Sequence, residues 1–341
     1  MKVFNRRSFI KSMTATGLGV SVMGKSALAK ERKVVKPATV GIIGLDTSHS
    51  PAFTKIINNP DDPETADFNV IAAYPYGSRT LEVSSSRIPG ITESVREMGI
   101  EIVDSIDELI DKVDFVLLET NDGHPRLEQA IKVMEAGKGL YVDKPVAGSL
   151  SDTIAVYEAS KKYNVPTFSS SSLRFITSAH EVRHENKIGK VIGVDAYSSA
   201  GREPSHPDFF WYGIHGVEII FAVMGTGCKS VTRTETDTTD IAVGVWDDDR
   251  MATFRGIRDG RGGIGGIAYG SEEILTLGPS QGYQPLIYSI LDFFRTGIPP
   301  VSMEETLEIY AFMEAADESK RQNGAPVALD YVLSEARKAT I

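Results

Sequence analysis

The chain has 341 residues, of which 41% are hydrophobic and 24% are charged, a composition typical of a folded protein long enough for two domains. This composition excludes a disordered chain and a collagen-like fibre. The net charge of −10 argues against nucleic acid or an anionic membrane surface as a partner. A single cysteine, Cys228, excludes an internal disulfide and a cysteine-only metal site.

Residues 1–29 resemble an export signal. Arg6-Arg7 lies in a segment, residues 5–11, that is similar to the bacterial twin-arginine signature, and the weakly apolar stretch 13–23 after it is too short to span a bilayer. Residues 27–29, Ala-Leu-Ala, supply the small residues of a signal-peptidase site. Removal of residues 1–29 takes away five Lys and Arg and no acid, which changes the net charge from −10 to −15. We therefore expect a periplasmic protein, exported in folded form by the twin-arginine translocase and without a membrane anchor.

Short β-rich runs alternate with amphipathic helical stretches between residues 37 and 170. The expected strands are 39–45, 68–74, 101–103, 115–119, 139–142 and 165–169. The expected helices are 51–57, 91–98, 106–109, 125–136 and 152–162. This alternation predicts a Rossmann-type, doubly wound parallel sheet, with ligands at the carboxyl ends of the strands.

The pattern changes in residues 171–341, which we expect to form an α+β domain. The expected strands follow one another as an antiparallel meander: 191–198, 230–236, 241–246, 251–258 and 272–277. The expected helices, which should cover one face of this open sheet, are 216–224, 286–294 and 304–322.

The first expected strand ends where a dinucleotide-binding chain carries Gly-x-Gly-x-x-Gly. Only Gly44 matches, because Asp46 and His49 replace the second and third glycines. Thr47 and Ser48 can donate hydrogen bonds to a phosphate, and the next helix offers its positive end. We expect Asp46 to turn away and cap that helix; a helix cap without any cofactor is the alternative that the local sequence leaves open.

The second expected strand lacks the terminal acid that holds an adenosine ribose in NAD-binding chains. Ser78 and Arg79 follow it instead and suit a 2′-phosphate, which favours NADP slightly over NAD.

Asp143-Lys144-Pro145 ends the fifth expected strand and resembles the Glu-Lys-Pro motif of the glucose-fructose oxidoreductase and inositol dehydrogenase family (Gfo/Idh/MocA), with Asp143 in place of the glutamate. Further matches follow in order between about residues 38 and 330: Phe115 to Thr120 with His124, Arg174-Phe175, Ile188 to Val191, His215 before an apolar helix that ends at Met224-Gly225, Glu314 to Ser319, and Pro326-Val327.

This resemblance implies a nicotinamide-dependent oxidoreductase that acts on a sugar, glycoside or cyclitol hydroxyl, in a homo-oligomer whose second domain binds substrate. Lys144 would position the substrate oxygen and contact the cofactor, and His215 would accept the proton. The resemblance also places Thr120, Asn121 and His124 at the cofactor and Arg174 at the substrate.

Trp211 stands where members of the family often have an acid, four residues before the histidine. With Tyr212 it offers an aromatic wall that suits a sugar ring, or alternatively domain packing.

His180-Glu181-Val182-Arg183-His184 matches the zinc-peptidase pattern His-Glu-x-x-His. An exposed amphipathic helix is the better interpretation of so short a match, and we expect no metal ion.

Two other functions remain open. The altered glycine loop favours a cofactor-free sugar-binding protein on the same fold, and an NAD-dependent glycosidase that oxidises its substrate transiently is a variant of the enzyme interpretation. Export in folded form indicates a tightly held cofactor that is loaded before export.

Overall fold

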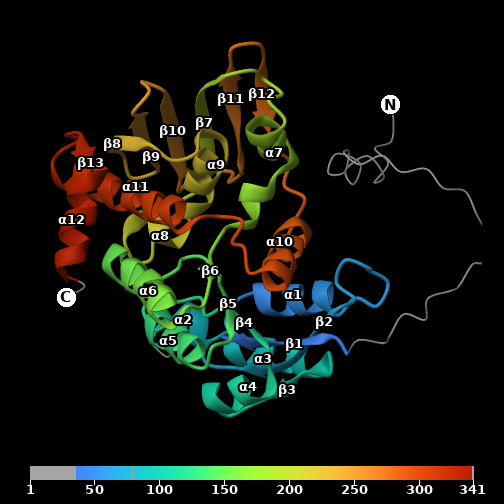
Figure 1. Cartoon of the computed structure of the whole chain (residues 1–341). Coiled ribbons are helices and arrows are strands. Elements are labelled where there is room, and N and C mark those ends of the chain that lie inside the picture. Colours follow the sequence, from blue (N-terminus) through green and yellow to red (C-terminus); the bar gives the residue numbers. More distant parts are fainter. Residues whose placement is uncertain (1–35, 79, 340–341) are drawn as a thin grey trace, which may run out of the picture. The chain divides into compact units, whose positions relative to one another are not determined.

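The computed structural model describes residues 36–78 and 80–339, which form one compact unit with two sheets (Figure 1). The first sheet has the strand order β3-β2-β1-β4-β5-β6, and all neighbouring strands are parallel. Its strands are β1 (Ala38–Ile43), β2 (Phe68–Tyr74), β3 (Glu101–Ile102), β4 (Phe115–Leu118), β5 (Gly139–Val142) and β6 (Thr167–Phe168). This order confirms the Rossmann-type sheet that the alternating pattern predicts.

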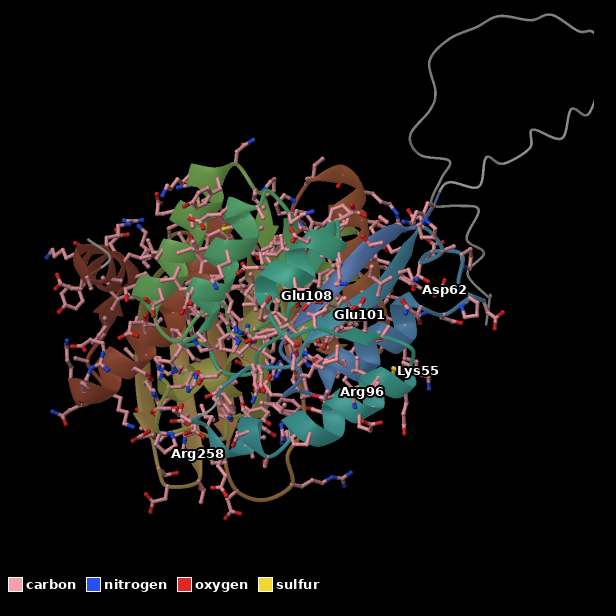
Figure 2. The ribbon with its side chains drawn as sticks, turned by 90° about the horizontal axis from the view of Figure 1, so that it is seen from below. Lys55, Asp62, Arg96, Glu101, Glu108 and Arg258 are labelled. Carbon is pink, nitrogen blue, oxygen red and sulfur yellow. The ribbon has the colours of Figure 1, made fainter. Side chains whose placement is uncertain are left out.

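Apart from α2, which the sequence pattern does not predict, the helices between these strands begin and end close to the expected residues. They are α1 (His49–Ile57), α2 (Glu82–Ser85), α3 (Ile88–Glu97), α4 (Ile106–Lys112), α5 (Arg126–Glu135) and α6 (Leu150–Tyr163). Ser105 and Ser149 cap α4 and α6, because each side-chain oxygen accepts a hydrogen bond from the N–H group three residues later. The short edge strand β3 carries Glu101, which Figure 2 labels. Glu101 forms an ion pair with Lys112 of α4.

Each face of the first sheet has its own hydrophobic cluster. Apolar side chains of α4, α5 and α6 pack on one face, and those of α1 and α3 pack on the other. Helix α10 (Gln284–Thr296) joins this second face, where Phe294 stacks on Phe115 at 4.4 Å between ring centroids. The expectation that residues 286–294 cover the second sheet is therefore wrong. The apolar side of α10 covers strands of the first sheet that α1 and α3 leave open.

The second sheet is mixed and mostly antiparallel, with the order β12-β11-β7-β10-β9-β8-β13. Its strands are β7 (Val191–Ser199), β8 (Cys228–Glu235), β9 (Thr239–Trp246), β10 (Met251–Ile257), β11 (Gly265–Gly270), β12 (Ile274–Leu277) and β13 (Val327–Ala328). A pure meander is wrong, because β7 inserts between β11 and β10 and pairs with β10 in parallel. β11 escapes the sequence pattern because half of its residues are glycines.

The helices of the second half other than α10 lie between the two sheets or cover the second sheet (Figure 1). They are a 3₁₀ helix (Ser172–Phe175), α7 (Thr177–His184), α8 (Asp208–Trp211), α9 (Ile214–Met224), α11 (Met303–Arg321) and α12 (Leu329–Ala339). α9 approaches β10 closely: a Cβ atom on Gly216 would lie 2.2 Å from the ring of Phe254. α9 carries His215, so this packing fixes the position of that histidine.

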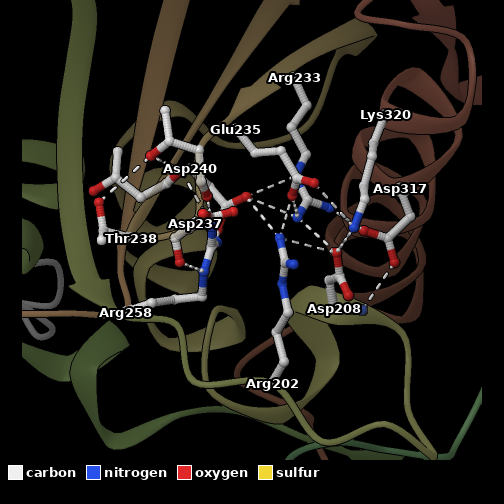
Figure 3. A network of polar contacts seen from close by, with 12 residues as sticks. Arg202, Asp208, Arg233, Glu235, Asp237, Thr238, Asp240, Arg258, Asp317 and Lys320 are labelled. Carbon is white, nitrogen blue, oxygen red and sulfur yellow. Dashed lines mark hydrogen bonds and ion pairs between the residues drawn. The ribbon is translucent and has the colours of Figure 1, made fainter.

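A network of ion pairs fixes the loop before α8 (Figure 3). Arg202 lies 3.2 Å from Asp240 of β9, and Asp208 lies 2.7 Å from Arg233 of β8. The backbone N–H of Asp208 also donates to Asp317 of α11. Residues 203–207 are therefore held at both ends.

None of the described helices is long and apolar enough to cross a membrane. The expected export signal lies outside the described residues.

Candidate active site

The loops that follow β1, β4 and β5 meet at the carboxyl edge of the first sheet. The strand order reverses between β1 and β4, and this is the place where open α/β sheets bind ligands. Gly44 has φ +95°, and a Cβ atom there would lie 2.5 Å from the backbone nitrogen of Thr120. Only glycine therefore lets the loop after β1 come this close to the loop after β4.

Asp46 points across this edge and does not cap α1. Its carboxylate accepts hydrogen bonds from the backbone N–H groups of Asn121 at 2.9 Å and Ser78 at 3.4 Å. The N-cap of α1 is Ser48, and its side chain makes no capping hydrogen bond. The expected capping role of Asp46 is therefore wrong: two backbone donors from the loops after β4 and β2 compete better for the carboxylate. Burial raises the pKa of Asp46, against the hydrogen bonds from Asn121, Ser84 and Ser78.

His49 forms an ion-pair-type contact with Asp143 where a dinucleotide-binding chain has its third glycine. Nδ1 of His49 lies 2.6 Å from the Asp143 carboxylate, and the ring stacks on Phe53. Burial disfavours ionisation of Asp143, but the interactions with His49 and then with Lys144 and Arg126 outweigh it and lower the pKa well below the usual range. Asp143 is therefore an ionised partner that holds the His49 ring in place.

Arg126, the first residue of α5, ties two of the loops together. Its fully buried guanidinium donates to the carbonyl oxygen of Thr120 at 2.6 Å and to that of Lys144 at 3.3 Å, and also to the carbonyls of Asp143 and Pro145. These bonds fix the backbone on which Lys144 stands. The sequence does not predict this role for Arg126, because an arginine at the start of an amphipathic helix usually faces solvent.

Lys144 and His215 line one cavity of about 440 Å³. Thr47, Ser48, His49, Asn121, Trp211, Tyr212 and Tyr283 also line this cavity. The predicted lysine, the aromatic wall and the predicted base are therefore brought together, although they come from the loop after β5, from the end of α8 and from α9.

Burial sets the protonation of the two central groups. It lowers the pKa of Lys144, as does Arg126, while Asp143 acts in the opposite sense. Burial, Lys144 and His49 lower the pKa of His215 to about 3, so this imidazole is neutral near pH 7. Nδ1 of His215 lies 2.7 Å from Oγ of Ser171. With its proton on Nδ1, the ring donates to Ser171 and leaves Nε2 as a proton acceptor.

Arg174 lies away from Lys144 and His215. Its guanidinium contacts Glu218 at 3.2 Å and also pairs with Glu305, and it lines a different cavity of about 560 Å³. The predicted role of Arg174 in substrate binding is therefore not supported, because buried carboxylates already occupy its donors.

His180 and His184 line that same second cavity on α7, with ring centroids 4.7 Å apart. Within residues 36–78 and 80–339, no third ligand-type side chain completes a metal-binding group with them.

A third cavity, of about 840 Å³, opens beside the loop that follows β2. Asp122, His124, Glu82, Glu203 and Ser205 belong to its lining. Oγ of Ser78 accepts a hydrogen bond from the N–H of Leu81 near this cavity, so this hydroxyl caps a turn. Arg79, the other predicted contact of a 2′-phosphate, lies outside the described residues.

Residues 38–170 match the model of GFO_IDH_MocA, described as an oxidoreductase family with an NAD-binding Rossmann fold. The matched residues contain the first sheet and the helices between its strands. An uncharacterized oxidoreductase of Streptococcus pneumoniae is 27% identical over 48% of this chain, and the chain spans about half the length of that curated relative.

Solved structures share the fold over nearly their whole length. Scyllo-inositol dehydrogenase from Lactobacillus casei, with bound NAD(H) and scyllo-inositol, gives a TM-score of 0.69 at 15% identity and covers 86% of this chain and 100% of its own. GenD2 from gentamicin A biosynthesis, in complex with NAD, gives a TM-score of 0.69 at 15% sequence identity. The match covers 91% of this chain and 99% of the GenD2 chain. At these identities the likeness concerns the fold.

The site fits a nicotinamide dinucleotide at both ends. The cavity with Lys144 suits the reactive end, and the larger cavity beside the loop after β2 has room for the adenosine end. Asn121 lines the cavity with Lys144, and the next residue, Asp122, lines the larger cavity. The two cavities therefore adjoin at the loop after β4. Asp46 disfavours the binding of a pyrophosphate, because its carboxylate already accepts hydrogen bonds from the N–H groups of Asn121 and Ser78.

Proposed function

We propose that this chain is a nicotinamide-dependent oxidoreductase that acts on a hydroxyl group of a sugar, glycoside or cyclitol. The observation that carries the proposal is the meeting of buried Lys144 and neutral His215 in one cavity at the carboxyl edge of an NAD-binding domain. Both groups have perturbed pKa values, as acid–base groups of active sites often do.

Each residue has a separate task in this reaction. Lys144 donates a hydrogen bond to the substrate oxygen and stabilises the negative charge that develops there. His215 accepts the hydroxyl proton at Nε2, while Ser171 orients the ring. His49, held by Asp143, lines the same cavity and is placed to pass that proton onward. The bound nicotinamide supplies a hydride acceptor.

The aromatic wall supports a ring-shaped polyol as substrate. Trp211 and Tyr212 line the cavity, and Tyr212 is partly exposed, so a sugar or cyclitol can stack there. The Lactobacillus casei structure holds scyllo-inositol on the same fold, which supports this substrate class.

The charge of the larger cavity favours NAD over NADP. Glu82, Asp122 and Glu203 line it, and no lysine or arginine is among its described lining residues. A 2′-phosphate would be repelled there. The slight preference for NADP from Ser78 and Arg79 is therefore reversed in this proposal.

Export by the twin-arginine pathway, a periplasmic location, a tightly held cofactor and a homo-oligomer complete the proposal. Their support is the sequence of residues 1–29 and the family resemblance.

The test is to release the nucleotide from protein purified after native export and to identify it by mass. The proposal expects about one NAD per chain. Protein that carries no nucleotide and binds none on titration would support a cofactor-free binding protein, which the position of Asp46 favours.

A further inference from the structure

Three ligand-type side chains form a group outside the cavity that holds Lys144 and His215: Asp122 and His124 line the 840 Å³ cavity, and buried His206 lies next to them. Asp122 and His124 follow β4, and His206 comes from the loop before α8. Oδ1 of Asp122 lies 2.7 Å from Nδ1 of His124 and 3.3 Å from Nε2 of His206. We propose that these three residues bind one divalent transition-metal ion such as Zn²⁺, because two imidazoles and one carboxylate are a preferred donor set for such ions.

The distances suit a metal site after small movements. Ligand atoms of a tetrahedral zinc site lie about 3.4 Å apart, since each bond is about 2.1 Å long. The distance from Asp122 to His206 is already 3.3 Å, and all three ligand atoms lie within 4.8 Å of one another. The shorter contact of Asp122 with His124 would lengthen by a fraction of an ångström, which the half-exposed His124 ring can allow.

The surroundings of His206 call for a cation. Its Nε2 faces two groups with opposite demands: the N–H of Gly123, a donor at 3.2 Å, and the carboxylate of Asp122, an acceptor at 3.3 Å. The His206 side chain is fully buried, so water does not resolve the conflict. No single protonation state of Nε2 serves both neighbours. A metal ion shared by Nε2 and Oδ1 pairs the imidazole with the carboxylate, and it takes the single lone pair of Nε2 from the N–H of Gly123.

The other nitrogen of His206 has the partner that metal-binding histidines usually have. Nδ1 lies 3.0 Å from Oγ of Ser205, whose hydroxyl donates to Glu203 at 3.4 Å. A proton on Nδ1 therefore donates towards a carboxylate through Ser205 and leaves Nε2 as the ligand atom.

Charge and rigidity also favour a cation here. Glu82 and Glu203 add two acids to Asp122, and the described lining of the cavity contains no lysine or arginine. The ion pairs of Arg202 and Asp208 hold both ends of the loop that carries His206 (Figure 3). The donor set is therefore preorganised, and three protein ligands leave open positions for a small oxygen ligand from the cavity.

The test uses the full chain without a polyhistidine tag, stripped of metal with a chelator. Titration with Zn²⁺ by calorimetry should show one ion per chain, and titration with Co²⁺ should give the visible absorption bands of a four- or five-coordinate ion. His124→Gln and His206→Gln should each weaken Zn²⁺ binding by more than about 100-fold. The half-exposed His124 makes the first variant safe for folding, which circular dichroism checks for both.

The double variant His180→Gln/His184→Gln is the matched control, since it removes the competing His-Glu-x-x-His pair. It should bind Zn²⁺ as the parent does. The proposal is overturned if the parent binds no ion at micromolar concentration, if His124→Gln leaves the affinity unchanged, or if the control variant loses the ion. The titrations use protein freed of nucleotide, because Asp122 and His124 line the cavity assigned to the adenosine end, and no substrate is added.

Discussion

Lys144 and His215 lie in one cavity because separate contacts fix the position of each residue. Arg126 holds the backbone around Lys144, and the close packing of Gly216 on Phe254 holds the helix that carries His215. Neither residue has a strong signal of its own in the sequence. Their roles could be predicted only from the order of the family-like motifs, while the geometry comes from residues that those motifs do not include.

We expect Lys144→Ala and His215→Ala each to lower turnover by about two to four powers of ten. The double variant should lose little more than either single variant, because both residues act on one proton transfer. NADH formation with a panel of cyclitols and sugars measures this. His184→Gln, outside the cavity, is the control. Small and additive losses would contradict the shared reaction centre.

The low pKa of His215 also predicts how stability depends on pH. The folded protein keeps His215 neutral down to about pH 3, whereas the unfolded chain takes up a proton near pH 6.5. The folded state therefore loses stability as the pH falls below 6.5. Between pH 7 and pH 4 the parent should lose about 3 kcal/mol more than His215→Gln. Urea unfolding at both pH values measures this difference, and equal losses would show that His215 is not buried in neutral form.

At the scale of elements, the strands and helices whose apolar residues recur at a regular spacing could be predicted from the sequence. The elements against which they pack could not. β2 and β5 begin and end as expected, because each is a short segment of mostly apolar residues. The packing position of α10 depends on which part of the first sheet the other helices leave uncovered. The sequence of α10 itself does not contain this information. The direction of Asp46 depends on Asn121 and Ser78, which lie 75 and 32 residues away.

The position of α10 gives a stability prediction. Phe294 is 7% exposed and packs on Phe68 and Phe115, so Phe294→Ala should lower the free energy of unfolding by about 3–5 kcal/mol. Ile298→Ala, just beyond the same helix and 71% exposed, should change it by less than about 0.5 kcal/mol. Chemical unfolding measures both variants. A small effect of Phe294→Ala would contradict the packing of α10 on the first sheet.

At the scale of the whole molecule, the proposed export in folded form and the proposed bound cofactor support one another. Arg6→Lys with Arg7→Lys should leave the precursor in the cytoplasm, because the twin-arginine translocase reads that pair. Cell fractionation and immunoblotting measure the location. Unchanged delivery of the variant to the periplasm would reject the proposed route.

The chain as a whole, with a net charge of −10, and its larger cavity are both acidic. Both disfavour a partner or ligand with many negative charges, and NAD carries fewer than NADP. Asp46 adds one more carboxylate at the place of the pyrophosphate. We therefore expect Asp46 to weaken the binding of NAD, so the proposed retention of the cofactor must come from the other contacts in the two cavities.

Calorimetric titration of the parent and of Asp46→Gly with NAD tests this directly. We expect the parent to bind NAD and the variant to bind it about ten- to a hundredfold more tightly. The reason is that the freed N–H groups of Asn121 and Ser78 can then donate hydrogen bonds to the phosphates. A parent that binds no NAD, beside a variant that does, would contradict the oxidoreductase proposal and favour a cofactor-free binding protein.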